Sequence, residues 1–398
     1  MAEDWDDGGS ASAGGDSYSE TTRVGWFSRI GEAFKGMLVG LILFVVAFPL
    51  LFWNEGRAVR DYQSNLEGER AVITVPADKV DPANEGKLVH VSGNAVTDDS
   101  IKDADFGVDA KALRLKRIAQ IYQWKETEKS SSSKNIGGSE TRKKEYAYEK
   151  VWANSVIDSG EFKLRDNHHN TGSLEFNSYV KNAAKITVGG FALPEMLSNR
   201  IAKFESINSA SIDPKNAGEA VRANWKPHGE WFHRGKDPSN PEIGDLRVKF
   251  EVVNPLDVSL FAQQVGGTFQ SYQTKYNAID RLDEGIKSAK EMFAEAQAEA
   301  ATLTWILRLV GFLLMAVGIY LLFKPFVIFA DVLPFLGSMM SYGIGLFAGL
   351  VALSFSLMTI AIAWIYYRPV LGVSLLAAGV GLIAFLMFRG KKSMPARK

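Results

Sequence analysis

The stretch GMLVGLILFVVAFPLLFWNEGRAVR, residues 36–60, decides how this chain is organised. Met37 to Trp53 is an uncharged, mostly apolar run of about 17 residues, near the lower limit for crossing the hydrocarbon core of a bilayer. Trp53 closes the run, as aromatic residues do at membrane interfaces. The run lacks the small-residue cleavage site of a secretory signal peptide, so residues 37–53 are predicted to be a retained transmembrane helix.

Further apolar segments lie close to the C-terminus. Residues 324–341 are apolar but broken by Asp331 and Pro334, and they are predicted to be an interfacial connector. Two interpretations of this connector stay open: an element that grips lipid, and a buried link between helices. The length and apolar composition of the segments themselves predict transmembrane helices at residues 303–323, 342–367 and 370–388.

Basic residues flank the outer ends of this set of segments. They occur within residues 23–36 and within a basic tail at 389–398, so the positive-inside rule places both termini in the cytoplasm. Residues 54–302 are then expected to face outward, although Arg57 and Arg60 lie on the side that the rule disfavours.

The N-terminal residues give two weaker signals. Residues 1–22 are rich in Gly, Ser and Asp and are predicted to be a disordered tail. In residues 23–36, apolar side chains recur at helical spacing opposite charged ones, which predicts an interfacial amphipathic helix. An early start of the first transmembrane helix is an equally good interpretation.

The stretch between the membrane segments is predicted to be mostly β-structure. Residues 54–275 contain β-forming runs separated by turn signals, which indicates a small barrel or sandwich. Within it, the polar residues 126–144 are predicted to be a long exposed loop. The predicted fold class is an integral membrane protein with four transmembrane α-helices, one N-terminal and three C-terminal, and a large β-rich (α+β) extracytoplasmic domain.

Residues 276–302 follow a heptad pattern. No Gly or Pro separates the end of the pattern from the next apolar segment, so one long helix is predicted to run into the membrane. Its apolar stripe could form a coiled-coil stalk between subunits, or it could pack on the β-rich domain of the same chain.

Composition argues against several classes of function. Forty-five basic residues balance 45 acidic ones, so no global positive field attracts nucleic acid and no such partner is expected. The absence of cysteine removes disulfides, thiolate metal sites and cysteine nucleophiles. The five histidines lack a recognised ligand spacing and are interpreted as exposed loop residues, so no metal site is predicted. Without a nucleophile motif, phosphate-binding loop or dinucleotide fingerprint, neither enzymatic activity nor a cofactor is expected.

Three sequence runs carry a resemblance to a known family. They are LFWNEGRAV at residues 51–59, TWILRLVG at 304–311 and ADVLPFLG at 330–337. With these runs the chain resembles the LUMA family, also called the transmembrane protein 43 family, over nearly its whole length. The resemblance implies a four-pass protein of the endoplasmic reticulum and inner nuclear membrane, linked to envelope organisation and self-association, and implies no enzymatic activity. The lack of cysteine and of glycosylation sequons favours a bacterial member, in the inner membrane with a periplasmic domain.

These motifs supply most of the candidate functional residues. Arg308, near the outer interface, is expected to extend towards water or lipid headgroups. Gly345 and Gly349 are four residues apart, a spacing that lets helices approach closely. The full set of motif and interface candidates is Asn54, Glu55, Gly56, Arg57, Trp305, Arg308, Gly311, Asp331, Pro334, Gly337, Gly345 and Gly349.

The leading functional hypothesis is a non-enzymatic membrane scaffold that self-associates and organises envelope proteins or lipids. Its expected partners are membrane lipids, other envelope membrane proteins and further copies of the chain. One alternative is a transporter or channel that uses Arg308 and Asp331 as coupling charges. A second alternative is an outward domain that binds or handles lipid.

Overall fold

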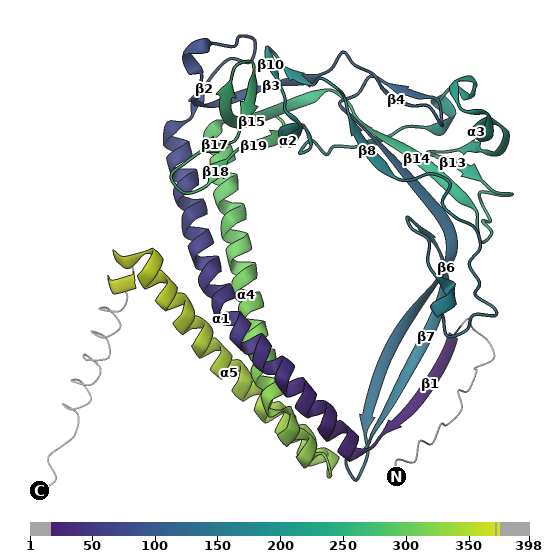
Figure 1. The fold of residues 1–398 in the computed structure, drawn as a ribbon, viewed down its shortest axis with the longest axis vertical. Coiled ribbons are helices and arrows are strands. Elements are labelled where there is room, and N and C mark those ends of the chain that lie inside the picture. The colour runs from purple at the N-terminus through teal and green to yellow at the C-terminus, as the bar shows by residue number, and fades with distance from the viewer. Residues whose placement is uncertain (1–16, 371, 375–398) are drawn as a thin grey trace, which may run out of the picture. The chain divides into compact units, whose positions relative to one another are not determined.

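The computed structural model describes residues 17–370 and 372–374, and these residues form two compact units (Figure 1). The β-rich unit contains residues 17–22, 66–131 and 143–294. The helical unit contains residues 23–65, 132–142 and the described residues from 295 onward.

Three helices in the described residues are long and apolar enough to cross a membrane. They are α1 (Trp26–Ala71), α4 (Ala289–Ala330) and α5 (Pro334–Tyr367). The predicted combination of apolar helices with a β-rich domain is therefore confirmed. The predicted fourth segment, 370–388, and the basic tail, 389–398, lie outside the described residues except for 370 and 372–374.

The first helix extends further than predicted in both directions. α1 is continuous from Trp26, so the structure has no separate amphipathic helix at 23–36 and favours the early start of the membrane helix. It also continues to Ala71, although residue 54 was predicted to begin the β-rich domain. Residues 54–71 contain no proline and several Glu and Arg residues, which are good helix formers.

The segment predicted to be an interfacial connector, residues 324–341, is helical apart from a short turn. α4 continues through Pro325 and α5 begins at Pro334, so only a short turn separates the two helices. A proline inside a helix removes one hydrogen bond, but Ile328, one turn later, is buried and keeps this end of α4 packed. A proline in the first turn of a helix carries no such penalty, which suits the start of α5.

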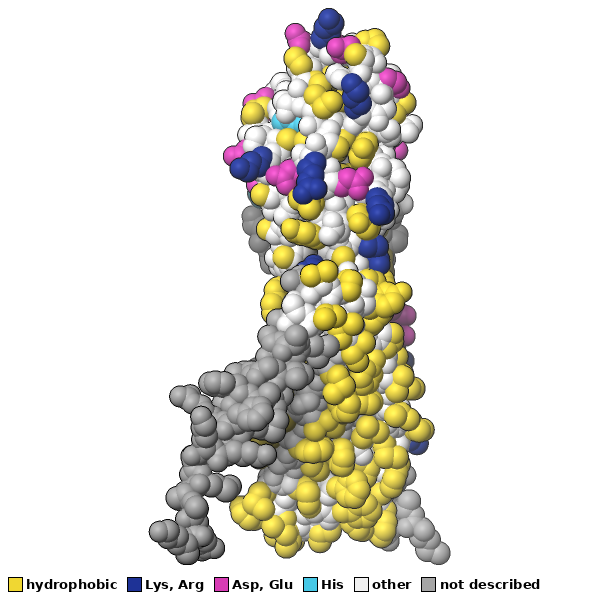
Figure 2. All heavy atoms as spheres, turned by 90° about the vertical axis from the view of Figure 1, so that its left-hand side faces the viewer, with side chains coloured by type: hydrophobic (Ala, Val, Ile, Leu, Met, Phe, Trp, Pro, Cys, Tyr) yellow, Lys and Arg dark blue, Asp and Glu magenta, His cyan; other side chains and the backbone are white. Residues whose placement is uncertain are grey.

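Glycines bring α1 and α4 into backbone contact. A Cβ atom added to Gly40 would lie 2.7 Å from the carbonyl oxygen of Gly318, and the reverse distance is also 2.7 Å. The outward faces of the helices carry exposed apolar side chains, which form the broad yellow surface in Figure 2. A small buried core between the helices consists of Ala47, Leu51, Met315, Ile319, Ala348 and Ala352.

Two sheets of described strands lie mainly in the β-rich unit. One has the order β1-β7-β6-β14-β13-β12, with β11 paired to β14 and β8 to β6. The other has the order β10-β9-β3-β15-β16, with β19 paired to β15 and β2 to β3. The first sheet contains β1 (Ser17–Val24), β6 (Arg114–Lys134), β7 (Glu140–Ala153), β8 (Tyr179–Asn182), β11 (Glu205–Ser206), β12 (Lys226–His228), β13 (Trp231–Arg234) and β14 (Leu246–Val253). The second contains β2 (Ile73–Thr74), β3 (Leu88–Val96), β9 (Thr187–Val188), β10 (Phe191–Ala192), β15 (Leu256–Val265), β16 (Thr268–Gln270) and β19 (Arg281–Glu284).

Smaller elements complete the unit. Residues 17–22, part of the predicted disordered tail, belong to β1 and pair with β7. The remaining elements are the strand pairs β4 (Ile101–Asp103) with β5 (Val108–Ala110) and β17 (Tyr272–Gln273) with β18 (Ala278–Ile279), and the helices α2 (Glu195–Ser198) and α3 (Glu219–Asn224).

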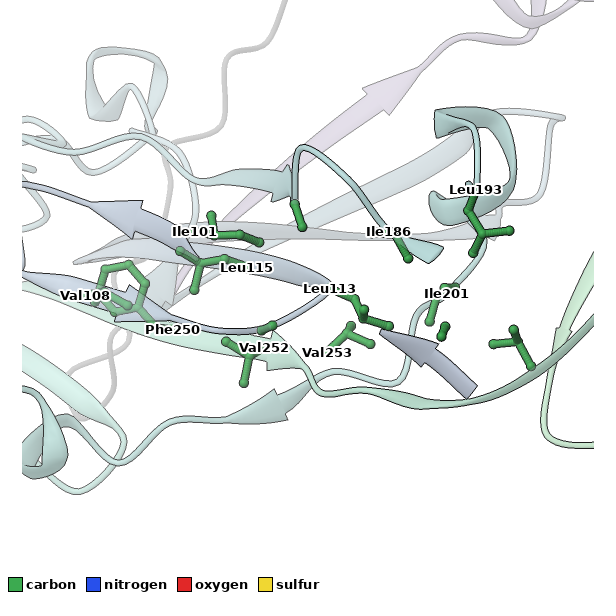
Figure 3. Close-up of a cluster of buried hydrophobic side chains, with 14 of the residues drawn as sticks. Ile101, Val108, Leu113, Leu115, Ile186, Leu193, Ile201, Phe250, Val252 and Val253 are labelled. Carbon is green, nitrogen blue, oxygen red and sulfur yellow. The ribbon is translucent and has the colours of Figure 1, made fainter. Parts of the chain in front are cut away.

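Side-chain alternation accounts for the central strands. In β14, Leu246, Val248, Phe250 and Val252 are buried, and charged residues alternate with them on the other face. β14 pairs antiparallel with β6, which places Leu115 opposite Val252. Side chains from these strands and their neighbours form the buried cluster in Figure 3.

The loop predicted at residues 126–144 is wrong, because this stretch forms the end of a hairpin. β6 runs to Lys134 and β7 starts at Glu140, and the turn between them contains two glycines at positive φ. Beyond Trp124 the side chains of β6 are mostly exposed on both faces, so no apolar alternation marks this strand in the sequence. The hairpin tip, residues 132–142, belongs to the helical unit.

The long helix predicted at residues 276–302 is wrong in its first part. That part forms β18 and β19, Gly285 has a φ of +89°, and α4 begins only at Ala289. The Glu291 amide donates to Ser288 Oγ at 3.3 Å, and the Ser288 amide donates to Glu291 Oε2 at 2.8 Å. This reciprocal cap is a helix-start signal that the sequence contains and that the heptad pattern obscured.

Ile279, Leu282 and Phe293 of the apolar stripe pack within the chain's own β-rich unit, as in the second of the two alternatives. Phe293 is fully buried, and its ring stacks on Phe261 of β15 with 4.2 Å between the ring centroids. Ile279 packs beside this pair, and Leu282 joins the main core. These side chains are therefore occupied within one chain and do not form a stalk between subunits.

Ser288→Ala is expected to lower the free energy of unfolding by about 1 kcal/mol, because the first amides of α4 lose a side-chain acceptor. Thr302→Ala removes a hydroxyl that bonds a carbonyl of its own helix, and it should change stability by less than about 0.5 kcal/mol. Thermal or denaturant unfolding in a single detergent measures both variants. Equal effects of the two substitutions would contradict the cap.

Candidate functional site: two buried ion-pair clusters

A buried ion pair joins three helices at one end of the apolar segments. Glu55 of α1 is 2% exposed, and its carboxylate accepts hydrogen bonds from Nε and Nη2 of Arg308 at 2.6 and 2.8 Å. The indole nitrogen of Trp364, in α5, donates to the same carboxylate at 2.7 Å. Paired hydrogen bonds between guanidinium and carboxylate are strong and fix orientation. We name Glu55, Arg308 and Trp364 the Glu55 cluster.

Two neighbouring polar residues extend this cluster towards α4. Asn54 is fully buried, and its side-chain amide donates to the carbonyl oxygen of Thr304 at 3.1 Å. Arg57 donates to Asn54 Oδ1 at 3.2 Å, to Thr304 Oγ1 at 3.1 Å and to Asp61 at 2.7 Å. The polar run that follows the first apolar segment is thus held against α4 by hydrogen bonds.

Gly56 and Gly311 permit the close packing around the Glu55 cluster. A Cβ atom on Gly56 would lie 2.5 Å from the ring of Tyr367. A Cβ atom on Gly311 would lie 2.4 Å from the side chain of Leu51. Both distances are shorter than the separations at which carbon atoms pack, so larger residues would push the helices apart.

The second cluster lies at the other end of the apolar segments. Asp331 is completely buried and accepts Nη2 of Arg29 at 2.6 Å and Nζ of Lys134 at 2.7 Å. Arg29 is itself 5% exposed, lies 3.0 Å from Glu140 and donates to the carbonyl oxygen of Gly138 at 2.5 Å. We name Arg29, Lys134, Glu140 and Asp331 the Asp331 cluster.

Further contacts fasten the hairpin tip to α1 and to the turn after α4. Arg142 donates to Glu32 at 2.6 Å, and this hydrogen bond raises the pKa of Arg142 above its ordinary value. The amide of Gly137 donates to the carbonyl oxygen of Val332 at 3.0 Å. The tip therefore adds basic and acidic side chains to a site that the helices alone would leave incomplete.

This contact bears on the predicted topology. The positive-inside rule predicted that residues 54–302 lie on the side of the membrane opposite residues 23–36. The hairpin tip, residues 132–142, instead touches Arg29 and Asp331. A tip that contacts Arg29 lies on the same side of the apolar segments as Arg29. The structure therefore does not support a single outward location for all of residues 54–302.

Pro334 and Gly337 shape the turn that holds Asp331. Pro334 occupies the first turn of α5, and Gly337 is buried in its second turn. A Cβ atom on Gly337 would lie 1.7 Å from Asp331 Oδ1, the oxygen that accepts the Lys134 ammonium. Any larger residue at this position would displace the carboxylate.

Three of the predicted candidates lie outside both clusters. Trp305 is 68% exposed and lies beside Arg308, whose guanidinium carbon is 4.7 Å from the centre of its ring. An added Cβ on Gly345 or Gly349 would meet no described atom within 4 Å. Within the described residues, the two glycines therefore have no other segment packed against them.

The motif residues were predicted from the sequence, but the pairs that they form were not. Arg308 was expected to extend to water or headgroups, but it pairs with Glu55, which is 253 residues away in the chain. Trp364, Arg29 and Lys134 were not among the predicted site candidates. No local signal marks Lys134, because it lies in a polar stretch and reaches Asp331 only through the hairpin.

The histidines were predicted to be exposed loop residues, and this is wrong for three of them. His90, His168 and His233 are 3%, 2% and 4% exposed. His168 stacks on Tyr148 with 3.9 Å between ring centroids, and His90 lies 3.0 Å from the carbonyl oxygen of Lys287. Over residues 17–370, no group of three or more His, Cys, Asp or Glu side chains is placed to hold a metal ion.

The β-rich unit contains a cavity of about 380 Å³ beside Arg114. Arg114 is 8% exposed, and burial lowers its pKa. It donates to the carbonyl oxygens of Asn199 and Ile201 and to the side chain of Asn182. Because the wall includes these polar groups, the cavity does not favour the lipid-binding alternative for this unit.

Known proteins are similar to this chain over nearly its full length. A family model described as Transmembrane protein 43 matches residues 121–369. The Homo sapiens protein named Transmembrane protein 43 is 31% identical over 392 residues, covering 95% of each chain. The Transmembrane protein 43 homolog of Drosophila melanogaster is 28% identical and covers 91% of this chain and 95% of its own. No solved structure matches this chain.

These relatives are animal proteins. The interpretation of the chain as a bacterial member, with a bacterial inner membrane and a periplasmic domain, is therefore not supported. The family expected from the sequence runs is confirmed by a model that covers more than half of the chain and by relatives that match almost all of it. The chain belongs to the transmembrane protein 43 family.

Proposed function

We propose that the chain is a non-enzymatic membrane scaffold that self-associates and organises membrane proteins or lipids through its β-rich domain. Family membership and the three apolar helices support its place in a membrane. Its partners would be membrane lipids, other membrane proteins and further copies of the chain. Because the relatives are animal proteins, we propose that the chain resides in the endoplasmic reticulum and inner nuclear membrane, as the family resemblance implied.

One observation carries the proposal: the charges at the ends of the apolar segments are tied into buried pairs between elements. Glu55 binds Arg308 and Trp364, and Asp331 binds Arg29 and Lys134. A transporter needs charged groups that line a path and exchange partners. Here both charges of the transport alternative hold elements together at opposite ends of the bundle, which favours a fixed framework.

An open small-residue face supports self-association. Gly345 and Gly349 lie on α5 with space for a neighbouring backbone, and this spacing allows close helix approach in membranes. We assign this face to a second copy of the chain. Residues 370–388 of the same chain are the alternative occupant, and the test below separates the two.

Gly345→Leu with Gly349→Leu is expected to convert an oligomer into monomers, because the added side chains keep the second backbone away. The protein mass is measured by light scattering in detergent at two concentrations, with bound detergent subtracted. Met358→Phe, an enlargement near the opposite face of α5 at a residue that is 56% exposed, is the control and should leave the mass unchanged.

Two outcomes would contradict the proposal. A wild-type protein that is monomeric at both concentrations and brings no stable set of membrane proteins through purification would rule out the scaffold. A double glycine variant that stays oligomeric but loses thermal stability would assign the face to residues 370–388 of the same chain.

A further inference from the structure

A cavity of about 200 Å³ opens beside the Asp331 cluster, between α1, the end of α4 and the hairpin tip. A water molecule takes up about 30 Å³, so the cavity has room for several water-sized groups. Its wall is strongly charged. The charged side chains that line it are Arg29, Lys134, Arg142, Lys324, Glu32, Glu140 and Asp331.

The cavity holds a surplus of positive charge. Each of its three carboxylates is already in an ion pair: Asp331 and Glu140 with Arg29, and Glu32 with Arg142. Lys324 is exposed and forms no ion pair with any residue in the described part of the chain. Four basic side chains thus face three acidic ones, and the unmatched charge is that of Lys324.

The surrounding segments extend this surplus over the whole end of the bundle. Residues 23–36, 132–142 and 324–341 together carry six basic and three acidic side chains. At the other end, residues 54–65, 295–308 and 364–368 carry four of each. The cytoplasmic ends of membrane helices are richer in basic residues, and the cytoplasmic leaflet beside them contains the anionic lipids.

The position of the cavity along α4 matches the depth of lipid phosphates. Lys324 directly follows the apolar stretch 303–323, which is about long enough to span the hydrocarbon core. Beside it, Phe326 and Phe329 are 57% and 49% exposed, and Leu333 is 54% exposed. Apolar side chains beside a charged pocket at a helix end suit the boundary between acyl chains and headgroups.

We propose that this cavity binds the phosphate of an anionic membrane lipid, with Lys324 and Arg142 as the side chains that contact the phosphate. The bound phosphate supplies the negative charge that the cavity lacks, while the apolar side chains beside it contact the acyl chains. A structural cluster alone would leave Lys324 without a role. The proposal rests on the part of the proposed function that names lipids as partners, assigns the lipid site to the helical unit, and does not require self-association.

The experiment is a binding titration of the full-length protein in mild detergent, read by native mass spectrometry. Dioctanoyl phosphatidic acid is the probe, dioctanoyl phosphatidylcholine is the zwitterionic comparison and inorganic phosphate is the soluble comparison. Phosphatidic acid is expected to bind at least about tenfold more tightly than either comparison, because it combines a free phosphate charge with acyl chains. Binding of inorganic phosphate as tight as that of phosphatidic acid would overturn the lipid assignment.

Paired variants move the affinity in opposite directions. Lys324→Glu is expected to weaken phosphatidic acid binding by about tenfold, since it replaces the unmatched cation by an anion. Glu32→Gln removes the closer of the two carboxylates that pair with Arg142, leaving Glu140 at 3.5 Å, and is expected to tighten binding by about threefold or more. Lys35→Glu makes the same charge change at an exposed lysine of α1 that does not line the cavity, and it should change the affinity by less than about twofold.

Equal effects of Lys324→Glu and Lys35→Glu would overturn the proposal, because they would reveal only general attraction to a basic surface. A Glu32→Gln variant that binds no more tightly than wild type would also overturn it. Light scattering on the same samples separates this result from the scaffold: a monomer that binds phosphatidic acid refutes self-association and leaves the lipid site intact. An oligomer that does not bind it refutes only the site.

Discussion

Glu55→Gln is expected to lower the free energy of unfolding by about 3 kcal/mol, because it leaves the Arg308 guanidinium buried without a counter-charge. Gln has nearly the size of Glu and keeps an acceptor for the Trp364 indole. The lost stability therefore measures the contribution of the Glu55 charge. The side chains of Glu55 and Arg308 are 3% and 17% exposed, and solvent therefore screens the pair weakly. Equilibrium unfolding in detergent, followed by circular dichroism, measures the effect.

A double-mutant cycle with Arg308→Met tests whether the two charges act as a pair. Removing both leaves apolar and amide groups in place of a buried ion pair, an exchange that is often close to neutral. The loss in the free energy of unfolding should therefore be smaller for the double variant than the sum of the two single losses. We expect this difference to be about 1–3 kcal/mol. Strictly additive losses would contradict the pairing and would assign each side chain a separate stabilising contact.

Asp331→Asn is expected to loosen the hairpin tip and to lower the free energy of unfolding by about 3 kcal/mol. Arg29 and Lys134 share this carboxylate, and Arg29 is too deeply buried to recover its hydration without local opening. Amide hydrogen exchange of residues 132–142 should rise together with the loss of stability. Hydrogen-exchange mass spectrometry of the full-length protein measures the local effect.

The matched control is Glu32→Gln, which removes a more exposed pair between α1 and the same hairpin tip. Exposed ion pairs contribute little, so this variant should change stability by less than about 1 kcal/mol and should leave most exchange protection in place. Unchanged exchange of the tip in Asp331→Asn would show that the hairpin is held by other contacts. In that case the Asp331 cluster would have no fastening role.

The apolar helices were accessible from the sequence because membrane insertion depends on the summed hydrophobicity of neighbouring residues. The ends of these helices could not be predicted, because a polar helical segment such as residues 54–71 contains no apolar run that would indicate it. The prediction of one helix from the apolar stripe at 276–302 failed for a related reason. Ile279 and Phe293 do face one apolar cluster, but they reach it from a strand and from a helix, respectively.

Partnerships between distant residues were beyond the reach of local patterns. The motif residues Glu55 and Asp331 were singled out, but Glu55 meets Arg308 across 253 residues and Asp331 meets Arg29 across 302. The end of the hairpin, which brings Lys134 to Asp331, lacks apolar alternation, so residues 126–144 were predicted to be a loop. Backbone hydrogen bonds and the docking of its tip hold this hairpin, and neither leaves a periodic signal.

The sequence by itself determined that the chain has apolar membrane helices, a β-rich domain and the motifs of its family. Each of these properties is a sum or a pattern over adjacent residues. Only the tertiary structure decided which charges pair, which glycines sit against a neighbour and which lysine beside a cavity forms no ion pair within the described residues. Those properties depend on distances of a few ångströms between segments far apart in the chain, and Coulomb attraction and packing are strong only at such distances.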